Sequence, residues 1–358
     1  NMKKKYRVLT MNPGSTSTKI AVYEEETSLF EETIRHSAEE LAGFADIYAQ
    51  YDFRREMVEQ ALAKHNFSVA DLHAVVGRGG ALKPISGGTY AVNEAMVDDL
   101  HHRVQVHHAS NLGGLIALGI AEPHGLPSFI VDPVCVDEME PIARISGWPE
   151  MPRRSIFHAL NLKATARRAA HELGKPVEDV TLVMGHLGGG ISFTVQQNGR
   201  MIDVINPMDG GALSPERAGY LPLSPLVELC YSGRYTFKEL MRKMVGQGGL
   251  IAHLGTGDAR EVERRIDAGD EQAALVYQAM AYQIAKELAA MTVVVNGRFD
   301  AIVLTGGLAY SRRLVEMIRE RVEFLGQVLV YPGEDELLAL AQGALRVLHG
   351  EEKAKVYE

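Results

Sequence analysis

The segment from Asn12 to Lys19 reads Asn-Pro-Gly-Ser-Thr-Ser-Thr-Lys and carries residue types that bind phosphate. Gly14 would let a ligand approach the backbone closely, and the hydroxyls of Ser15, Thr16 and Ser17 can donate to phosphate oxygens. Because Ser17 and Lys19 are two residues apart, a strand would place both side chains on one face. No Gly-Lys-Ser/Thr ends a glycine loop before a helix, so the nucleotide P-loop pattern is absent. An ordinary hydroxyl-rich hairpin turn remains the alternative.

A second candidate is the loop His186-Leu-Gly-Gly-Gly190. Gly188, Gly189 and Gly190 leave room for a ligand close to the backbone, and His186 could reach a ligand held there. A packing reason for the glycines and a hydrogen-bonded core histidine are the competing interpretations.

Two arginines and one aspartate could handle an anion. Arg78 is flanked by glycines, and Arg217 ends the loop segment Ser-Pro-Glu-Arg. Guanidinium groups match carboxylate and phosphoryl oxygens in pairs, so both arginines are candidate anion clamps, although surface arginines are common. Asp132 follows a predicted buried strand, where ligand sites of α/β proteins collect. It could hold Mg²⁺ or orient a phosphoryl group, and a helix-cap or turn role is the alternative.

Thr305-Gly306-Gly307 follows the predicted strand 301–304 and forms a strand-to-helix turn of the kind that admits a nucleotide. The third glycine of the dinucleotide fingerprint is missing, which disfavours a Rossmann dehydrogenase.

The hydrophobic pattern predicts strands alternating with long helices, which is typical of an α/β fold. The predicted strands are 7–11, 19–23, 72–76, 128–131, 180–184, 191–196, 301–304 and 327–331. The predicted helices are 39–67, 93–103, 112–122, 155–173, 224–245, 271–295, 312–325 and 336–348, followed by a solvated end at 351–355. A strand–turn–strand unit with a small-residue loop occurs twice, half a chain apart. This indicates either a duplicated two-lobed protein or two unrelated hairpins.

The composition limits the functional class. The 358 residues are 46% hydrophobic and 23% charged, with 37 Lys+Arg against 46 Asp+Glu and a net charge of −9. This excludes a disordered or fibrous protein and argues against a nucleic-acid or membrane-surface binder. The only cysteines, Cys135 and Cys230, exclude thiol metal clusters and a disulfide framework. No apolar stretch approaches the ~20 residues of a membrane span, so we expect a soluble, cytoplasmic protein.

Three segments together are similar to the acetate/butyrate kinase family: Asn12–Lys19, 183–190, and Ser214-Pro-Glu-Arg-Ala-Gly219. The resemblance extends over nearly the whole chain and is greatest to the butyrate kinase branch. It implies a two-lobed, duplicated ribonuclease H-like (actin-like ATPase) fold with mixed sheets flanked by helices. The first lobe would comprise residues 1–154, with the C-terminal helix of 335–358 packed back on it. The second lobe, 155–334, would carry the adenosine site.

The implied reaction is reversible, Mg²⁺-dependent phosphoryl transfer between ATP and butyrate or a branched short-chain acid, giving an acyl phosphate and ADP. Acetate or propionate kinase is the alternative enzyme, and a nucleotide-binding regulatory protein on the same fold is the alternative from another class. The expected partners are a small carboxylate, ATP and further copies of the chain in a homo-oligomer, with no nucleic acid or membrane.

The resemblance also implies roles for individual residues. Catalysis would rest on Arg78, Asp132, His186 and Arg217, and phosphate binding on Asn12, Ser15, Ser17, Lys19, Gly188, Gly189 and Gly190. Asp258, Gly306 and Gly307 would bind the nucleotide, Phe157 and His158 would lie in the substrate region, and Asp132 and Glu336 would be linked to magnesium.

Overall fold

The computed structural model describes residues 4–104 and 106–358 of the chain. The chain divides into two compact units: unit 1 comprises Asn1–Val136 and Asp335–Glu358, and unit 2 comprises Asp137–Glu334. The family resemblance predicts a first lobe of 1–154 with 335–358 and a second lobe of 155–334, and this division stays a prediction. Among the described helices, none is both long enough and apolar enough to cross a membrane.

Unit 1 contains a six-stranded mixed sheet in the order β3-β2-β1-β4-β6-β5. Its strands are β1 (Arg7–Pro13), β2 (Ser17–Glu24), β3 (Thr27–Arg35), β4 (Ala74–Arg78), β5 (Thr89–Ala91) and β6 (Ser128–Val131). Strands β1, β2 and β3 form an antiparallel meander, whereas β4 and β6 continue the sheet parallel to β1. The glycine-containing turn predicted between 11 and 19 therefore joins the first two strands.

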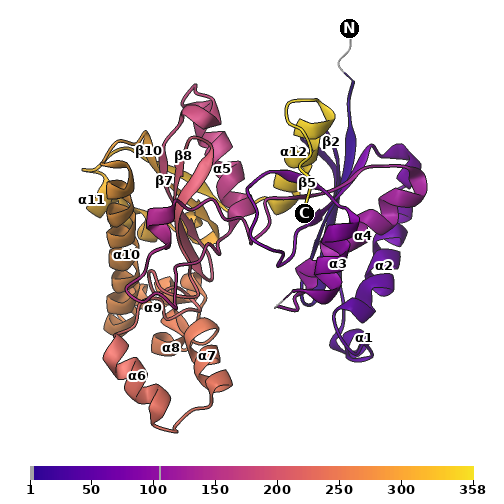
Figure 1. Ribbon diagram of the computed structural model, residues 1–358. Helices are drawn as coiled ribbons and strands as arrows, with labels where there is room; N and C mark the ends of the chain where they lie inside the picture. The colour runs from indigo at the N-terminus through magenta and orange to yellow at the C-terminus, as the bar shows by residue number, and fades with distance from the viewer. Residues whose placement is uncertain (1–3, 105) are drawn as a thin grey trace. The chain divides into compact units, whose positions relative to one another are not determined.

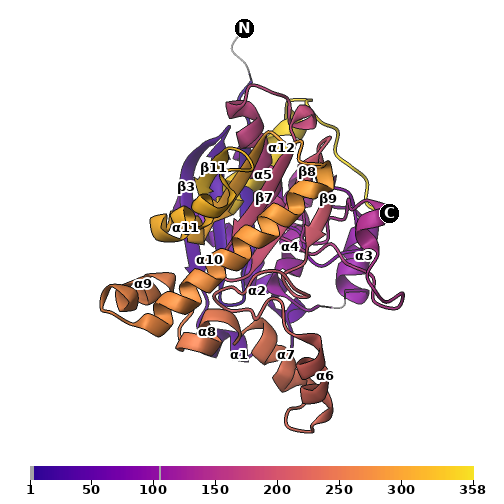
Figure 2. The same cartoon turned by 90° about the vertical axis from the view of Figure 1, so that its left-hand side faces the viewer.

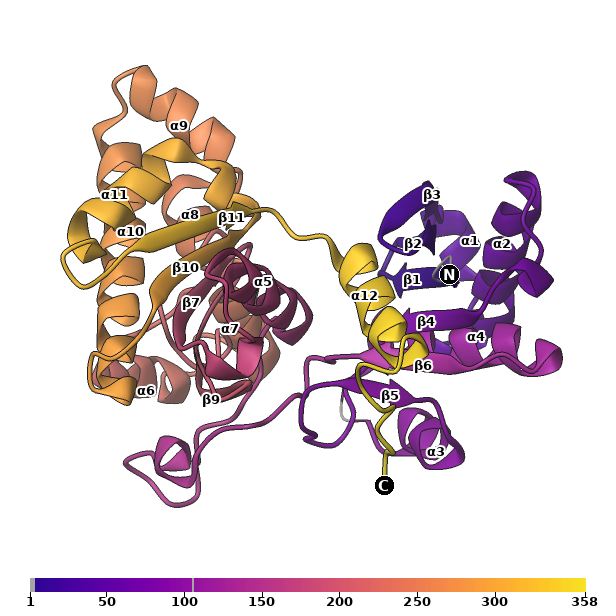
Figure 3. The ribbon, with the colours of Figure 1, turned by 90° about the horizontal axis from the view of Figure 1, so that it is seen from above.

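Helices cover both faces of this sheet. They are α1 (Ala38–Ala42), α2 (Tyr51–Lys64), α3 (Glu94–His102), α4 (Leu112–Ala121) and α12 (Glu336–Leu348), with 3-10 turns η1 (Tyr48–Gln50), η2 (Val69–Asp71), η3 (Ala109–Asn111) and η4 (Glu122–His124). Helix α12 lies along one face, and α2 and α4 lie along the other (Figure 3). The prediction of one helix over 39–67 is wrong, because α1 ends at Ala42 with Gly43 as its C-cap, and a turn separates it from α2.

The glycine before Arg78 has a packing function. A Cβ atom on Gly77 would stand 2.0 Å from the carbonyl oxygen of Gly113 in α4. Side chains cannot approach backbone this closely, so Gly77 lets α4 lie directly against β4. The helix thereby fixes the end of the strand that carries Arg78.

In the predicted solvated end, 351–355, residues Glu351, Lys353 and Lys355 are exposed, but the segment is attached to β5. Helix α12 stops at Leu348, and the chain then returns to β5, where the Lys355 N–H donates to the Thr89 carbonyl over 2.8 Å. The Tyr357 ring is buried, and its hydroxyl donates to the Asp99 carboxylate over 2.7 Å. The charged residues around Tyr357 favour exposure of this segment. The free energy gained by burying the aromatic ring is larger and holds the segment against unit 1.

Unit 2 repeats the same strand plan. Its five-stranded sheet has the order β11-β10-β7-β8-β9, with β7 (Leu182–Leu187), β8 (Ile191–Gln197), β9 (Arg200–Ile205), β10 (Ala301–Gly306) and β11 (Val328–Pro332). Strands β7, β8 and β9 form an antiparallel meander, and β10 and β11 are parallel to β7. The order 9-8-7-10-11 corresponds to 3-2-1-4-6 in unit 1. This shared topology favours duplication and excludes two unrelated hairpins.

The helices of unit 2 are mostly those expected from the pattern. They are α5 (Ala159–Glu172), α6 (Leu223–Tyr231), α7 (Phe237–Val245), α8 (Gly249–Leu254), α9 (Ala259–Asp267), α10 (Glu271–Thr292) and α11 (Arg312–Val322), with 3-10 turns η5 (Pro141–Arg144), η6 (Val177–Asp179), η7 (Val293–Val295) and η8 (Gly307–Tyr310). Helices α5 and α10 lie on opposite faces of the sheet (Figure 1), and α8 and α9 pack against α10 (Figure 2). The single helix predicted over 224–245 is wrong. The chain turns between α6 and α7 at Gly233, whose φ of 72° is left-handed.

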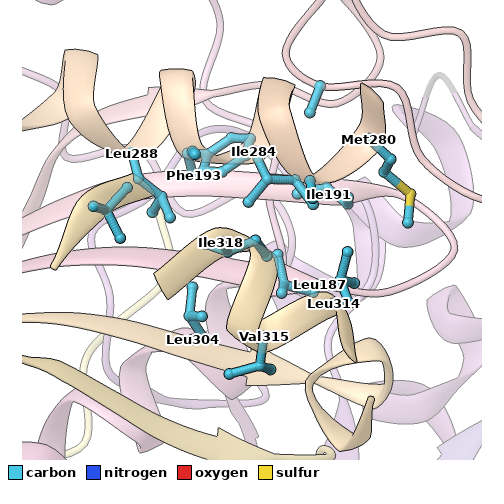
Figure 4. Close-up of a cluster of buried hydrophobic side chains, with 14 of the residues drawn as sticks. Leu187, Ile191, Phe193, Met280, Ile284, Leu288, Leu304, Leu314, Val315 and Ile318 are labelled. Atoms are coloured by element: carbon cyan, nitrogen blue, oxygen red, sulfur yellow. The ribbon is translucent and has the colours of Figure 1, made fainter. Parts of the chain in front are cut away.

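The core of unit 2 lies between the sheet and two helices. Side chains of α10 and α11 interdigitate with those of β7, β8 and β10, as Figure 4 shows for Ile284, Ile318 and Phe193. All three are fully buried. The packing holds the carboxyl ends of β7 and β10 in fixed register.

Candidate functional site

In unit 1, three predicted site residues lie at the same edge of the sheet. Strands β1, β4 and β6 are parallel, so their carboxyl ends meet at one edge. Asn12 lies near the end of β1, Arg78 is the last residue of β4, and Asp132 follows β6 directly. Ligands of α/β proteins bind at this edge because the loops there are free to vary.

Glu336 joins this group from the first turn of α12. One carboxylate oxygen, Oε2, accepts a hydrogen bond from the Asn12 amide and forms an ion pair with Nη1 of Arg78. All three side chains are partly buried, so the charge-assisted contacts are shielded from solvent. The structure therefore brings together Asn12, Arg78 and Glu336.

The first loop is a tight turn between two antiparallel strands. The Gly14 N–H donates to the Ser17 carbonyl over 2.7 Å, which closes a tight turn between β1 and β2. Asn12 is the cross-strand partner of Lys19, so the two side chains share one face with Ser17. That face is the one on which α12 packs, since Ala21 and Tyr23 contact Leu337 and Ala341 of that helix.

A buried arginine supports this loop from the opposite face. The Arg54 side chain in α2 is fully buried, and its guanidinium donates to the Ser17 carbonyl over 3.1 Å, the Thr18 hydroxyl over 3.2 Å and the Ser15 carbonyl over 3.4 Å. Burial lowers its pKa, and no carboxylate pairs with it in the part of the chain that the structure describes. Burial is the main cause of the lowered pKa of His36 and of His108, and the charge of Arg54 is a smaller cause in both. The Arg54 guanidinium therefore places a buried positive charge against the backbone of the loop.

We expect Arg54→Met to lower the free energy of unfolding by about 2–4 kcal/mol, because several buried acceptors lose their donor together. Arg55→Met is the matched control, since Arg55 is partly exposed on the same helix. Its expected cost is below about 1 kcal/mol. Urea titration followed by circular dichroism measures both, and equal midpoint shifts for the two variants would contradict a supporting role for Arg54.

Asp132 occupies a constrained position. It is 2% exposed, its φ of 40° is left-handed, and its Oδ1 accepts from the Gly88 N–H over 2.7 Å. A non-glycine residue in this conformation is held by its surroundings and is frequent at functional sites. The helix-capping alternative does not apply, because no helix of the described residues begins at Asp132.

Unit 2 shows the same arrangement at its own sheet. Strands β7, β10 and β11 are parallel, and His186 and Thr305 are register partners near the carboxyl ends of β7 and β10. Gly306 follows with a left-handed φ of 90°, and a Cβ atom there would stand 2.4 Å from the Leu187 carbonyl. The backbone of β7 lies so close to residue 306 that only glycine fits there, whatever ligand binds nearby.

The glycine loop receives the segment that carries Arg217. Gly189 accepts two bonds at its carbonyl, from the Ser214 hydroxyl over 2.7 Å and from the Glu216 N–H over 3.1 Å. A Cβ on Gly190 would lie 2.7 Å from Cζ of Arg217, so the guanidinium lies directly against the loop. The packing interpretation of these glycines is therefore supported, beside any role in ligand binding.

Arg217 has a hydrogen-bond donor with no partner. Its Nε atom is buried and makes no hydrogen bond to any described residue, and burial lowers the pKa of the guanidinium. Buried donors are almost always paired, so an unpaired one calls for an explanation. An anionic ligand at the glycine loop would satisfy this donor.

His186 and His158 form a pair in unit 2. Their rings stack with centroids 4.3 Å apart, and the Nε2 atoms lie 3.5 Å and 2.9 Å from Oε2 of Glu334. Phe157, next to His158, is buried at 2% exposure. The structure therefore groups His158, His186 and Glu334.

Asp258 is not joined to this group by any contact of the described residues. It is the exposed N-cap of α9, where its carboxylate accepts from the Arg260 N–H over 2.9 Å. Its bonds to Arg260 lower its pKa. Gly307 begins η8 directly after Gly306.

Comparison with known proteins places the chain in a family. The sequence profile of the Acetokinase family matches residues 150–347, more than half of the chain. The chain belongs to the acetokinase family. Its members transfer a phosphoryl group to a carboxylate, so the chain is assigned to the phosphotransferases with a carboxyl acceptor.

Solved structures agree with the acetokinase assignment at the level of the fold. An acetate kinase from Porphyromonas gingivalis superposes with a TM-score of 0.80 at 20% identity, covering 96% of this chain and 100% of that one. A propionate kinase from Francisella tularensis subsp. tularensis SCHU S4 gives 0.75 at 19% identity, covering 94% and 98%. A ROK family protein from Streptococcus pneumoniae TIGR4 gives 0.54 at 12% identity, covering 97% and 100%. The predicted actin-like ATPase fold, with two mixed sheets flanked by helices, is thereby confirmed.

In each unit, the sequence left some neighbours of the candidate residues unidentified. Arg54 occupies the buried helical pattern formed with Val58, Ala61 and Leu62, and an arginine in that pattern was a usable signal. Glu334 gave no usable sequence signal, because it is one of several acidic residues in a short segment. Asn161, which contacts His186, lies three residues after His158, a spacing typical of a helix start.

Proposed function

We propose that this acetokinase is a butyrate kinase, which transfers the γ-phosphoryl group of ATP reversibly to butyrate or a branched short-chain acid. The observation that carries the proposal is the unpaired, buried Nε of Arg217 against the glycine loop, in a chain of a carboxylate kinase family. A donor of this kind suits an anionic group that binds and leaves. Acetate or propionate remains the competing acceptor, since the solved relatives include enzymes named for both.

The preference for butyrate rests on the sequence. The opening Asn-Pro-Gly-Ser-Thr-Ser-Thr-Lys departs from the acetate-type Asn-Ala-Gly-Ser-Ser-Ser pattern and is similar to the butyrate branch. Discrimination between C2 and C4 acids depends on pocket volume, and a methylene is worth only ~1–3 kcal/mol. Substrate choice is therefore a matter for measurement.

The proposed mechanism is direct in-line transfer. A carboxylate oxygen of the acid forms a bond to the γ-phosphorus as the bond to the β–γ bridging oxygen breaks, and ADP leaves. Protein groups accelerate such a step by positioning and charge neutralisation. Arg78 and Arg217 would neutralise carboxylate and phosphoryl oxygens, and His186 would donate to the transferred group.

The remaining predicted residues would bind the substrates. Phosphate oxygens would be held by Asn12, Ser15, Ser17, Lys19 and the Gly188–Gly190 loop, and adenosine by Asp258, Gly306 and Gly307. Phe157 and His158 would contact the acid.

Magnesium fits the donor chemistry of unit 1. Asp132 and Glu336 offer carboxylate oxygens, the ligands that Mg²⁺ prefers. Asp132 is almost fully buried with a backbone N–H on one oxygen, and the Glu336 oxygen Oε2 is held by Asn12 and Arg78. The bound ion would neutralise charge on the nucleotide phosphates. Asn12 and Arg78 would keep the Glu336 carboxylate oriented toward it.

The test is acyl phosphate capture. The protein is incubated with ATP, Mg²⁺, hydroxylamine and a series of C2 to C6 acids, and the hydroxamate product is measured. We expect the highest kcat/KM at C4 and loss of the product when EDTA removes Mg²⁺. A maximum at C2 or C3 would make the protein an acetate or propionate kinase, and absence of product with every acid would overturn the proposal.

A further inference from the structure

The two stacked histidines of unit 2, His158 and His186, contact the same residue through their Nδ1 atoms. His158 precedes α5 and His186 lies in β7, and both direct Nε2 toward the Glu334 carboxylate. Their other ring nitrogens, the Nδ1 atoms, both contact Asn161 in the first turn of α5.

Asn161 satisfies each Nδ1 with a different donor. Its backbone N–H donates to Nδ1 of His158 over 3.3 Å, which caps the helix, and its side-chain amide contacts Nδ1 of His186 over 2.9 Å. Asn161 is 5% exposed, so neither bond competes with bulk water. A backbone N–H can only donate, so the Nδ1 atom of His158 must accept.

The orientation of the Asn161 amide follows from its other partner. The Thr305 hydroxyl donates its single proton to the Gly333 carbonyl over 3.2 Å, so it accepts from the amide 3.1 Å away. The amide therefore presents its NH₂ group to Thr305. The second hydrogen of that group is directed to His186, whose Nδ1 is consequently an acceptor as well.

Two acceptor Nδ1 atoms determine where the ring protons are. In a neutral imidazole one nitrogen carries hydrogen and the other a lone pair, so both rings carry theirs on Nε2. His158 and His186 therefore present two N–H donors in the same direction. The Glu334 oxygen Oε2 is the group that they face.

This proton arrangement weighs against a metal at the same place. His158, His186 and Glu334 are the types of ligand that hold zinc, with atoms within 4.8 Å of one another. Coordination through Nε2 would need hydrogen on each Nδ1, which a metal-bound histidine donates to an acceptor. Asn161 offers a backbone N–H and an amide NH₂ instead, so the pair is built to donate hydrogen bonds.

We infer that Asn161 is a positioning residue, which fixes the tautomers of His158 and His186 so that both donate through Nε2 to an anionic oxygen. This inference rests on the proposed function, in which that oxygen belongs to the carboxylate or the phosphoryl group in transfer. The position of the Glu334 carboxylate shows that one anionic oxygen can face both donors at once. Asn161 itself touches neither substrate nor nucleotide in this account.

The first test reads the tautomers without any assay of activity. The protein is labelled with ¹⁵N-histidine, and long-range proton–nitrogen correlations are recorded at pH 8.5. We expect Nε2–H for both His158 and His186, assigned with His158→Gln and His186→Gln. Hydrogen on Nδ1 of either ring, alone or with Nε2, would overturn the inference in the unmodified protein.

The second test changes the donor. In Asn161→Asp, a carboxylate replaces the amide, and we expect His186 to move its hydrogen to Nδ1 and kcat to fall roughly 10²–10³-fold with a smaller change in KM. Thr165→Val is the matched control, because Thr165 is buried one turn along α5 and contacts Thr305 over 3.5 Å but neither histidine at Nδ1. It should keep both tautomers and near-normal kcat.

The outcomes separate the two proposals. An unmodified protein with both Nε2–H tautomers that forms no acyl phosphate would refute the proposed function and leave the tautomer assignment standing. An active enzyme in which Asn161→Asp retains both the tautomers and the turnover would refute the inference alone.

Discussion

Arg78→Ala is expected to lower kcat for acyl phosphate formation by roughly 10³-fold or more, the scale of a lost charge-neutralising arginine in phosphoryl transfer. The guanidinium stands at the carboxyl end of β4, held by the Glu336 carboxylate that also binds Asn12. Arg78→Lys should recover little, because an ammonium cannot reproduce the two-pronged geometry. Steady-state kinetics with butyrate and ATP give kcat and both KM values.

The control for Arg78 is Arg103→Ala. Arg103 is exposed at the end of α3, where it pairs with Asp98 and Asp99 of the same helix. Its removal should leave kcat within a factor of two and the melting temperature nearly unchanged. Near-normal turnover in a folded Arg78→Ala variant would remove Arg78 from the mechanism.

Arg217→Ala is expected to lower kcat by roughly 10²–10³-fold, the range seen when one donor to a developing charge is lost. The reason is the buried Nε, which has no protein partner and lies against Gly190. Gly190→Ala should act in the same direction, because the added Cβ would displace the guanidinium by occupying a position 2.7 Å from its Cζ. The same kinetic assay measures both variants.

Arg200→Ala serves as the control in unit 2, since Arg200 is exposed at the start of β9. It should behave as the unmodified protein. If Arg217→Ala reduced stability but left kcat unchanged in the folded fraction, Arg217 would be a structural residue and the proposed anion site would be wrong.

The duplicated sheet plan could be predicted because its signals are local. Runs of β-branched residues separated by a glycine turn indicate a hairpin wherever they occur, and they occur in both units. Strand β3 was missed because none of its residues is buried, whereas β2 contains the continuous buried run Ile20–Tyr23. Helix ends at Gly43 and Gly233 were missed because the apolar spacing continues past both glycines.

The candidate site residues also differ in whether a local sequence signal identifies them. Arg78 and His186 stand next to glycine turns, and the sequence was sufficient to single them out. The partners that orient them lie far along the chain: Glu336 for Arg78, and Asn161 with Glu334 for His186. Such contacts depend on tertiary packing, which residue spacing does not record.

The central claim, that this acetokinase passes phosphate from ATP to a carboxylate, is tested most directly by ³¹P NMR of one reaction. The protein is mixed with ATP, Mg²⁺ and butyrate without a trapping agent, and the phosphorus resonances are followed with time. We expect an acyl phosphate resonance that grows in equal amount with ADP while inorganic phosphate stays low. Release of inorganic phosphate alone, or an unchanged ATP spectrum in the presence of every short-chain acid, would contradict it.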